Sequence, residues 1–242
     1  MALVDSARLG GALIAVTILA AACGGAGEDD TQSKAARTTS QEQPAVREGE
    51  LLLQDDFSDS SSGWRDTARK EGEARYVEGA YRITAKQARR QIWSEITGPT
   101  VQGLRLEFEA TQVAGTTGDL VGVRCYTDAD SNAGYVVGIA PVEPGYALAS
   151  FRGDEYRLLE SSGEPVEAIR PLREQNQLRV ECLTMPGGPT VLTLAVNGQA
   201  LVRAEDEAGH RGFDGVGLFV DTTEGGADAI FDDFVMIELL PD

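Results

Sequence analysis

Short stretches of alternating apolar and polar residues, separated by turns, constrain the fold of this chain more than any other feature. In 104–110 apolar and charged residues alternate strictly, which is the period of a strand with one buried and one wet face. Asn197-Gly198 joins two such runs and is a strong hairpin signal, because a type I′ turn needs φ > 0 at both central positions. No convincing helix is visible after Leu51, so the chain from Leu51 onward is predicted to be all β.

About a dozen such strands follow one another over about 190 residues, with turns every 8–12 residues or so, which suits a two-sheet antiparallel sandwich. A parallel α/β fold is excluded because it needs crossover helices. The first strand, Leu51–Asp59, and the last, Ala229–Leu239, both contain Asp-Asp-Phe. We expect these two strands to lie side by side and to close the domain.

The last strand carries a conflict in its pattern. Strict alternation places Phe231 and Asp233 on one face, and Asp232 and Phe234 on the other, so each face receives one aromatic and one acidic side chain. We therefore predict that the start of this strand lies at the rim of the sheet and that the apolar run from Val235 lies deeper.

The N-terminus is typical of a secretory signal. Arg8 precedes an apolar run of 13 residues, Gly10–Ala22, which is too short to cross a bilayer, since that takes about 20 residues. The sequence before Cys23 resembles a bacterial lipobox, with Leu19 one position early. Residues 1–22 are thus predicted to be a lipoprotein signal, Cys23 the lipidated residue, 23–50 a flexible tether and 51–242 the folded domain. The alternative is an ordinary signal peptide that leaves Cys23 free.

The chain is acidic, with a formal charge of −18. This disfavours nucleic acid as a partner, because phosphate binding needs a basic surface. The acidity serves either solubility outside the cell or a divalent-cation site. Asp55, Asp56, Asp232 and Asp233 would meet if the terminal strands pair, and Ca²⁺ prefers six to eight or so oxygen ligands, so a structural calcium is one hypothesis. The other is that these carboxylates are solvated or cap turns.

Two further cysteines, Cys125 and Cys182, each stand in phase with apolar neighbours and are predicted to point into the core. In an oxidising compartment such a pair favours a disulfide. The alternative is two buried, reduced thiols on distant strands.

Most catalytic signatures are absent from the sequence. Zinc-binding spacings of His and Cys, a Gly-x-Ser-x-Gly elbow and a phosphate-binding loop do not occur. A glycoside hydrolase needs two carboxylates at a fixed separation, and 39 acidic residues leave that pair open. Whether the chain is an enzyme stays uncertain, and the sequence favours a binding role.

A series of turn and strand motifs occurs in a fixed order along the chain: Asp56-Phe57, Gly63-Trp64, Tyr76…Gly79…Tyr81-Arg82-Ile83, Gly122-Val123-Arg124-Cys125, Asn176…Cys182, Val196-Asn197-Gly198, Gly215…Val220 and Phe231-Asp232-Asp233-Phe234. This order resembles that of the concanavalin A-like lectin/glucanase group. Within this group the chain is most similar to bacterial lipoproteins and to laminin G-like modules. The resemblance covers about residues 51 to 240. It implies a jelly roll of two antiparallel sheets, one of them concave, with adjacent terminal strands.

Sugar binding calls for aromatic platforms beside polar groups. Arg124 and Tyr126 project from one strand face, and Tyr135, Tyr146 and Trp93 lie on strands nearby in the chain; these five are the candidate ligand-binding residues, with edge packing as the alternative. By analogy we predict a lipid-anchored binding module on the extracytoplasmic face of the cell membrane, for cell-envelope or extracellular carbohydrate. A structural or protein-interaction module of the envelope is the second hypothesis, and a glycoside hydrolase the third.

Overall fold

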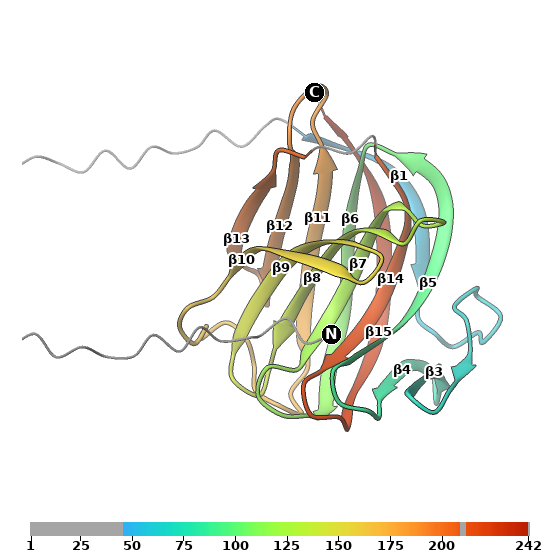
Figure 1. Cartoon of the computed structure of the whole chain (residues 1–242). Helices are drawn as coiled ribbons and strands as arrows, with labels where there is room; N and C mark the ends of the chain where they lie inside the picture. Colours follow the sequence, from blue (N-terminus) through green and yellow to red (C-terminus); the bar gives the residue numbers. More distant parts are fainter. Residues whose placement is uncertain (1–45, 209–211, 242) are drawn as a thin grey trace, which may run out of the picture. The chain divides into compact units, whose positions relative to one another are not determined.

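The computed structural model describes residues 46–208 and 212–241, which form two antiparallel sheets packed face to face (Figure 1). The strands are β1 (Val46–Asp55), β2 (Thr67–Ala68), β3 (Gly72–Val77), β4 (Ala80–Ala85), β5 (Arg90–Val101), β6 (Gly103–Ala114), β7 (Leu120–Asp128), β8 (Ala133–Ala140), β9 (Gly145–Arg152), β10 (Glu155–Ser161), β11 (Asn176–Thr184), β12 (Thr190–Val196), β13 (Gln199–Asp206), β14 (Phe213–Thr222) and β15 (Ala227–Pro241). No helix occurs in these ranges, and the predicted all-β sandwich is confirmed.

The two sheets differ in size. The larger has the order β13-β12-β11-β6-β15-β4-β3-β2, with β1 also paired to β15. The smaller has the order β10-β9-β8-β7-β14-β5. Apolar side chains from both inner faces form one core, as the alternation in β6 predicts: Leu104, Leu106 and Phe108 are buried, and the charged residues between them face outward.

The predicted seam between the terminal strands is confirmed. β1 pairs antiparallel with β15, with Asp55 opposite Phe234 and Gln54 opposite Val235. β1 begins at Val46, inside the segment predicted as tether. The signal sequence, Cys23 and the tether up to residue 45 lie outside the described residues. Within the described ranges, no helix is long and apolar enough to cross a membrane.

The prediction for the start of β15 is wrong. Phe231 and Phe234 are both fully buried, whereas Val235–Glu238 is only half-buried. The register against β6 shifts between Asp232 and Val235, and Asp233 has φ of 48°, so the strand carries a β-bulge there. The extra residue resets the alternation, sends both rings into the core and leaves Asp233 exposed.

Two tight turns and a covalent link support the strand pairing. Asn197 and Gly198 have φ of 51° and 82°, as predicted for the β12–β13 hairpin, and Glu78-Gly79 makes the same kind of turn between β3 and β4. Cys125 of β7 and Cys182 of β11 form the predicted disulfide, which joins the two sheets through the core.

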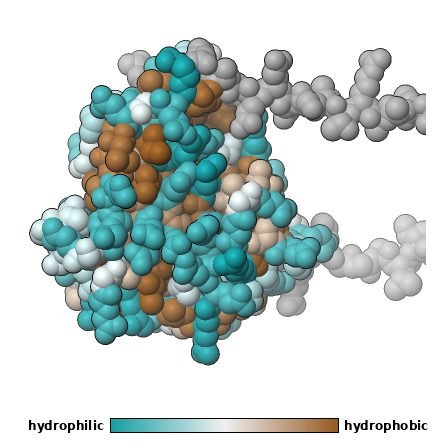
Figure 2. Space-filling model, turned by 180° about the vertical axis from the view of Figure 1, so that it is seen from behind, coloured by the Kyte–Doolittle hydropathy of each residue, from teal (hydrophilic) through white to brown (hydrophobic). Residues whose placement is uncertain are grey.

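The outward face of the larger sheet is charged. Arg105 pairs with Glu48 and Glu181, and Arg179 pairs with Glu107 at 2.7 Å between Nε and Oε1. Figure 2 shows the molecule from behind, where hydrophilic residues are interspersed with smaller hydrophobic areas. This face therefore matches the wet face that the alternation predicts.

Candidate ligand-binding cleft

The outward face of the smaller sheet differs from a wet face, because apolar and aromatic side chains cover it. Tyr126, Val136, Phe151 and Phe219 belong to a second buried cluster, separate from the core. Glycines make room for the rings: a Cβ on Gly217 would lie 3.3 Å from Cε2 of Tyr126. On this face the rings therefore pack close against the backbone.

The β9–β10 hairpin covers part of this face. The two edge strands of the sheet are β10 and β5, yet the Tyr156 hydroxyl of β10 donates a hydrogen bond to Oε1 of Gln91 on β5, at 3.2 Å. In Figure 1, β10 crosses in front of the strands of this sheet. The Tyr156 ring packs against Phe151, and Phe151 packs edge-on against Tyr126. The sheet thus curls so far that its opposite edges meet through side chains.

Arg124 lies at the centre of this face and is fully buried. Its guanidinium carbon is 4.0 Å from the ring centroid of Phe151, 4.6 Å from that of Trp93 and 4.9 Å from that of Tyr126. Nη2 donates to Oδ1 of Asn132, but Nε and Nη1 have no hydrogen-bond partner among the described residues. Burial lowers the pKa of Arg124. Three aromatic faces stabilise this cation, and the charge of the Glu95 carboxylate acts in the same direction.

Trp93 connects the buried cluster to solvent. Its ring contacts Arg124, and its side chain is nevertheless 37% exposed. The indole Nε1–H donates a hydrogen bond to Oε2 of Glu95 at 3.1 Å. Held by a cation on its ring and a carboxylate at its edge, the indole is presented to solvent in a defined orientation.

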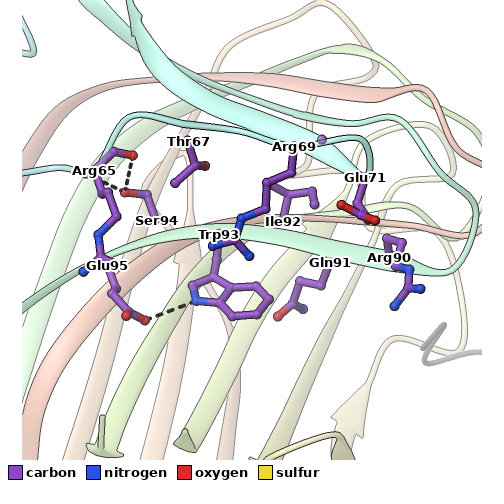
Figure 3. A pocket seen from close by; sticks show the side chains of 11 residues that line it. Arg65, Thr67, Arg69, Glu71, Arg90, Gln91, Ile92, Trp93, Ser94 and Glu95 are labelled. Atoms are coloured by element: carbon purple, nitrogen blue, oxygen red, sulfur yellow. Dashed lines mark hydrogen bonds between the residues drawn. The ribbon is translucent and has the colours of Figure 1, made fainter. Parts of the chain in front are cut away.

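A cleft of about 400 Å³ opens beside Trp93, between β5 and the segment that contains β2. Its lining residues are Arg65, Thr67, Arg69, Glu71, Gly72, Arg90, Gln91, Ile92, Trp93, Ser94 and Glu95. Figure 3 shows the arginine, threonine and glutamate side chains of 65–71 above the side chains of β5. The Arg65 backbone N–H donates to the Ser94 hydroxyl at 3.0 Å, which ties the two walls together. The cleft therefore combines an exposed indole with charged hydrogen-bonding groups.

The structure brings together three of the five predicted ligand-binding residues. Trp93, Arg124 and Tyr126 are in contact, although Tyr126 is fully buried. Tyr135 lies inside the sandwich, where its hydroxyl donates to Oδ2 of Asp206 at 3.1 Å, so we exclude it from the site. Tyr146 packs half-buried against the same core and does not line the cleft.

Sequence reasoning missed the three arginines that line the cleft, Arg65, Arg69 and Arg90. The signal available was local charge: Arg65, Arg69 and Lys70 stand close together, and Arg89 precedes Arg90, in a chain with 39 acidic and 21 basic residues. These arginines line one cleft only because the segment that contains β2 lies against β5. That long-range placement cannot be predicted from a local sequence pattern.

The aspartates of the calcium hypothesis lie at the terminal seam. Asp55 accepts bonds from the Phe57 N–H at 2.8 Å and the Ser62 hydroxyl at 2.5 Å. The Ser58 hydroxyl and N–H bind Asp56 and lower its pKa, whereas burial raises the pKa of Asp232. In the part of the chain that the structure describes, no group of three or more His, Cys, Asp or Glu side chains is arranged to hold a metal ion. The calcium site stays a prediction of the sequence alone.

Comparison with known proteins defines the fold class. No protein-family model matches the chain, and no curated protein matches it significantly. A solved Bacillus subtilis protein of unknown function with a galectin-like fold is similar over 82% of this chain and 100% of its own, with a TM-score of 0.60 and 11% identity. The carbohydrate recognition domain of Emp47p is similar over 73% and 88%, with a TM-score of 0.51 and 11% identity.

A solved sialidase is also similar, over 77% of this chain and 18% of its own, with a TM-score of 0.52 and 12% identity. At such low identity these likenesses show the fold alone. The chain is a galectin-like, jelly-roll β-sandwich, which confirms the jelly roll implied by the sequence resemblance. The finer likeness to laminin G-like modules and to bacterial lipoproteins stays a prediction.

Proposed function

We propose that this chain is a carbohydrate-binding module, held at the extracytoplasmic face of the cell membrane by a lipid on Cys23, and that the cleft beside Trp93 is its binding site. The observation that carries the proposal is the exposed indole, fixed between Arg124 and Glu95 at the wall of a 400 Å³ cleft. Pockets that bind small molecules combine such an apolar surface with a few placed polar groups.

Trp93 suits the apolar face of a sugar ring. An indole presents a large flat surface for C–H groups, and its orientation here is already set by two contacts, so little side-chain freedom is lost on binding. The arginines supply hydrogen-bond donors around the ring, and the Thr67 hydroxyl supplies a donor and an acceptor. The names of the similar structures support the same class of ligand, since one is a carbohydrate recognition domain and another a sialidase.

A glycan array with the full-length chain, extracted in detergent, tests the binding role. We expect Trp93→Ala to weaken binding of the best glycan at least about tenfold, because aromatic anchors dominate such contacts. Leu51→Ala is the matched control, since Leu51 is 59% exposed on β1 outside the cleft and its truncation removes an apolar side chain without touching the site. A melting curve for each variant verifies folding.

Two results of this array contradict the proposal. If no glycan binds, the structural or protein-interaction hypothesis is favoured. If a glycan binds equally well to the folded Trp93→Ala variant, its site lies elsewhere on the molecule. A screen with chromogenic glycosides addresses the glycoside hydrolase hypothesis.

The lipid anchor is tested independently. We expect the intact mass of the membrane-extracted protein to correspond to a chain that begins at Cys23 and carries acyl groups, because two or more acyl chains anchor a protein firmly. As a flexible tether, the roughly 22 residues between Cys23 and the start of β1 at Val46 then give the domain a reach of roughly 26 Å r.m.s.. A mass that matches an unmodified Cys23 removes the anchor from the proposal.

A further inference from the structure

The cleft is richer in positive charge than the chain as a whole. Three guanidinium groups, those of Arg65, Arg69 and Arg90, line it, whereas the chain as a whole carries a formal charge of −18. Two carboxylates share the cleft, Glu71 and Glu95, and the Glu95 carboxylate already accepts the Trp93 indole N–H. An electropositive cleft on an acidic protein attracts negatively charged ligands selectively.

Within the described residues, the side chains of the three arginines have no hydrogen-bond or ion-pair partner, in contrast to six other arginines that form salt bridges. Salt bridges neutralise Arg75, Arg82, Arg105, Arg157, Arg179 and Arg203. By contrast, the side chains of Arg65, Arg69 and Arg90 are exposed and make no hydrogen bond or ion pair with any residue in 46–208 or 212–241. Their donors are therefore available to a ligand without the loss of an existing salt bridge.

The chemistry of these donors selects the kind of anion. A guanidinium presents paired N–H groups that match the two oxygens of a carboxylate or sulfate, and such charge-assisted bonds are stronger than neutral ones. The arginines come from different segments, 65–69 and the start of β5, so they reach the cleft from both walls. The arrangement suits an extended ligand with several anionic groups better than a single small anion.

We infer that the ligand of this cleft is an anionic saccharide, in which the Trp93 indole stacks on a sugar ring and Arg65, Arg69 and Arg90 bind carboxylate or sulfate groups on that ring and its neighbours. This inference rests on the proposed function, because it names the class of carbohydrate that the same cleft binds. Arg124 acts here as a positioning residue, since it contacts the Trp93 ring from the buried side.

A matched pair of probes tests the charge requirement. Binding of the full-length chain in detergent is measured by calorimetry for an oligogalacturonide and for its methyl-esterified form, which has the same sugar backbone without the charge. We expect the methyl ester to bind at least about tenfold more weakly, and the affinity for the oligogalacturonide to fall as salt rises.

Charge-removing variants locate the effect. Arg65→Gln, Arg69→Gln and Arg90→Gln are each expected to weaken oligogalacturonide binding by about fivefold, and the triple variant to bind acid and ester equally. Arg179→Gln is the control, because it removes the same charge from the outward face of the other sheet. The side chains of Arg65, Arg69 and Arg90 are exposed and make no hydrogen bond or ion pair within the described residues, so we expect these variants to fold as the natural chain does.

The outcomes separate this inference from the proposed function. Equal binding of acid and ester, lost in Trp93→Ala, overturns the anionic assignment and leaves a neutral-sugar site. An acid preference that persists in the triple variant also overturns it. The absence of binding to every glycan tested overturns both proposals.

Discussion

Reduction of the Cys125–Cys182 disulfide is expected to lower the free energy of unfolding by about 4 kcal/mol. The bond joins β7 of the smaller sheet to β11 of the larger and spans 57 residues of sequence. In the oxidised protein this loop stays closed after unfolding, which limits the entropy of the unfolded chain. Both cysteines are fully buried between the sheets, so they keep their packing when only the covalent bond is lost.

Urea denaturation of the oxidised and the reduced natural chain measures this difference directly. The reduced protein retains both sulfur atoms, so it serves as the control that separates the covalent link from the cavity in a Cys125→Ala/Cys182→Ala variant. The unfolding slope is expected to rise on reduction, because an unfolded chain without the cross-link exposes more surface. Identical midpoints for oxidised and reduced protein contradict the prediction.

The sequence predicts the inward-facing cysteines of the disulfide because strand alternation is a local property. Cys125 and Cys182 each stand in phase with apolar neighbours, and an inward-facing position follows from the period of two alone. The same reasoning places Arg124 and Tyr126 on the opposite face of β7, which the structure confirms. The hairpin at Asn197-Gly198 is equally local, since the turn geometry depends on those two residues.

Alternation fails where tertiary packing changes the register. At Asp233 the chain adopts a positive φ, and the bulge lets Phe234 join a cluster with Trp64 and Phe108. A glycine often signals a positive φ in a sequence, but Asp-Asp-Phe contains none, so the bulge is not visible from these residues. The aromatic partners lie far away in sequence, so nothing local in β15 reports that both rings belong in the core.

The candidate site shows the same limit. The period of β7 identifies the face that Arg124 occupies but not what covers that face, and the covering residues Phe151 and Tyr156 come from the curled β9–β10 hairpin. The cleft itself forms between β5 and the segment at 65–72. These two segments are brought together by long-range packing of the sandwich and not by any local pattern. Local sequence therefore identifies Trp93 as a candidate and gives no reason to group it with Arg65.

The second large effect concerns pH. Asp221, in β14 beside Gln91 of β5, is only 4% exposed, and its Oδ1 atom has no hydrogen-bond partner in the described ranges. Burial raises the pKa of Asp221 to about 7, and the nearby charge of Asp119 acts in the same direction. In the unfolded chain an aspartate has a pKa of about 3.9. The folded state therefore holds this proton over a range of pH in which the unfolded state has released it.

Because the folded state binds more protons here, the contribution of Asp221 to stability is fully present below about pH 4 and is lost as pH rises to about 7. The loss amounts to about 4 kcal/mol over this window. The free energy of unfolding is measured in urea from pH 4 to pH 8. Asp221→Asn is expected to remove this pH dependence. The free energy of unfolding of the natural chain, relative to that of the variant, therefore falls by about 4 kcal/mol over this range. Asp130→Asn removes an exposed carboxylate from the β7–β8 turn and is expected to leave the profile unchanged. Parallel profiles for the natural chain and Asp221→Asn contradict the raised pKa, because a carboxyl with an ordinary pKa releases its proton at the same pH in both states.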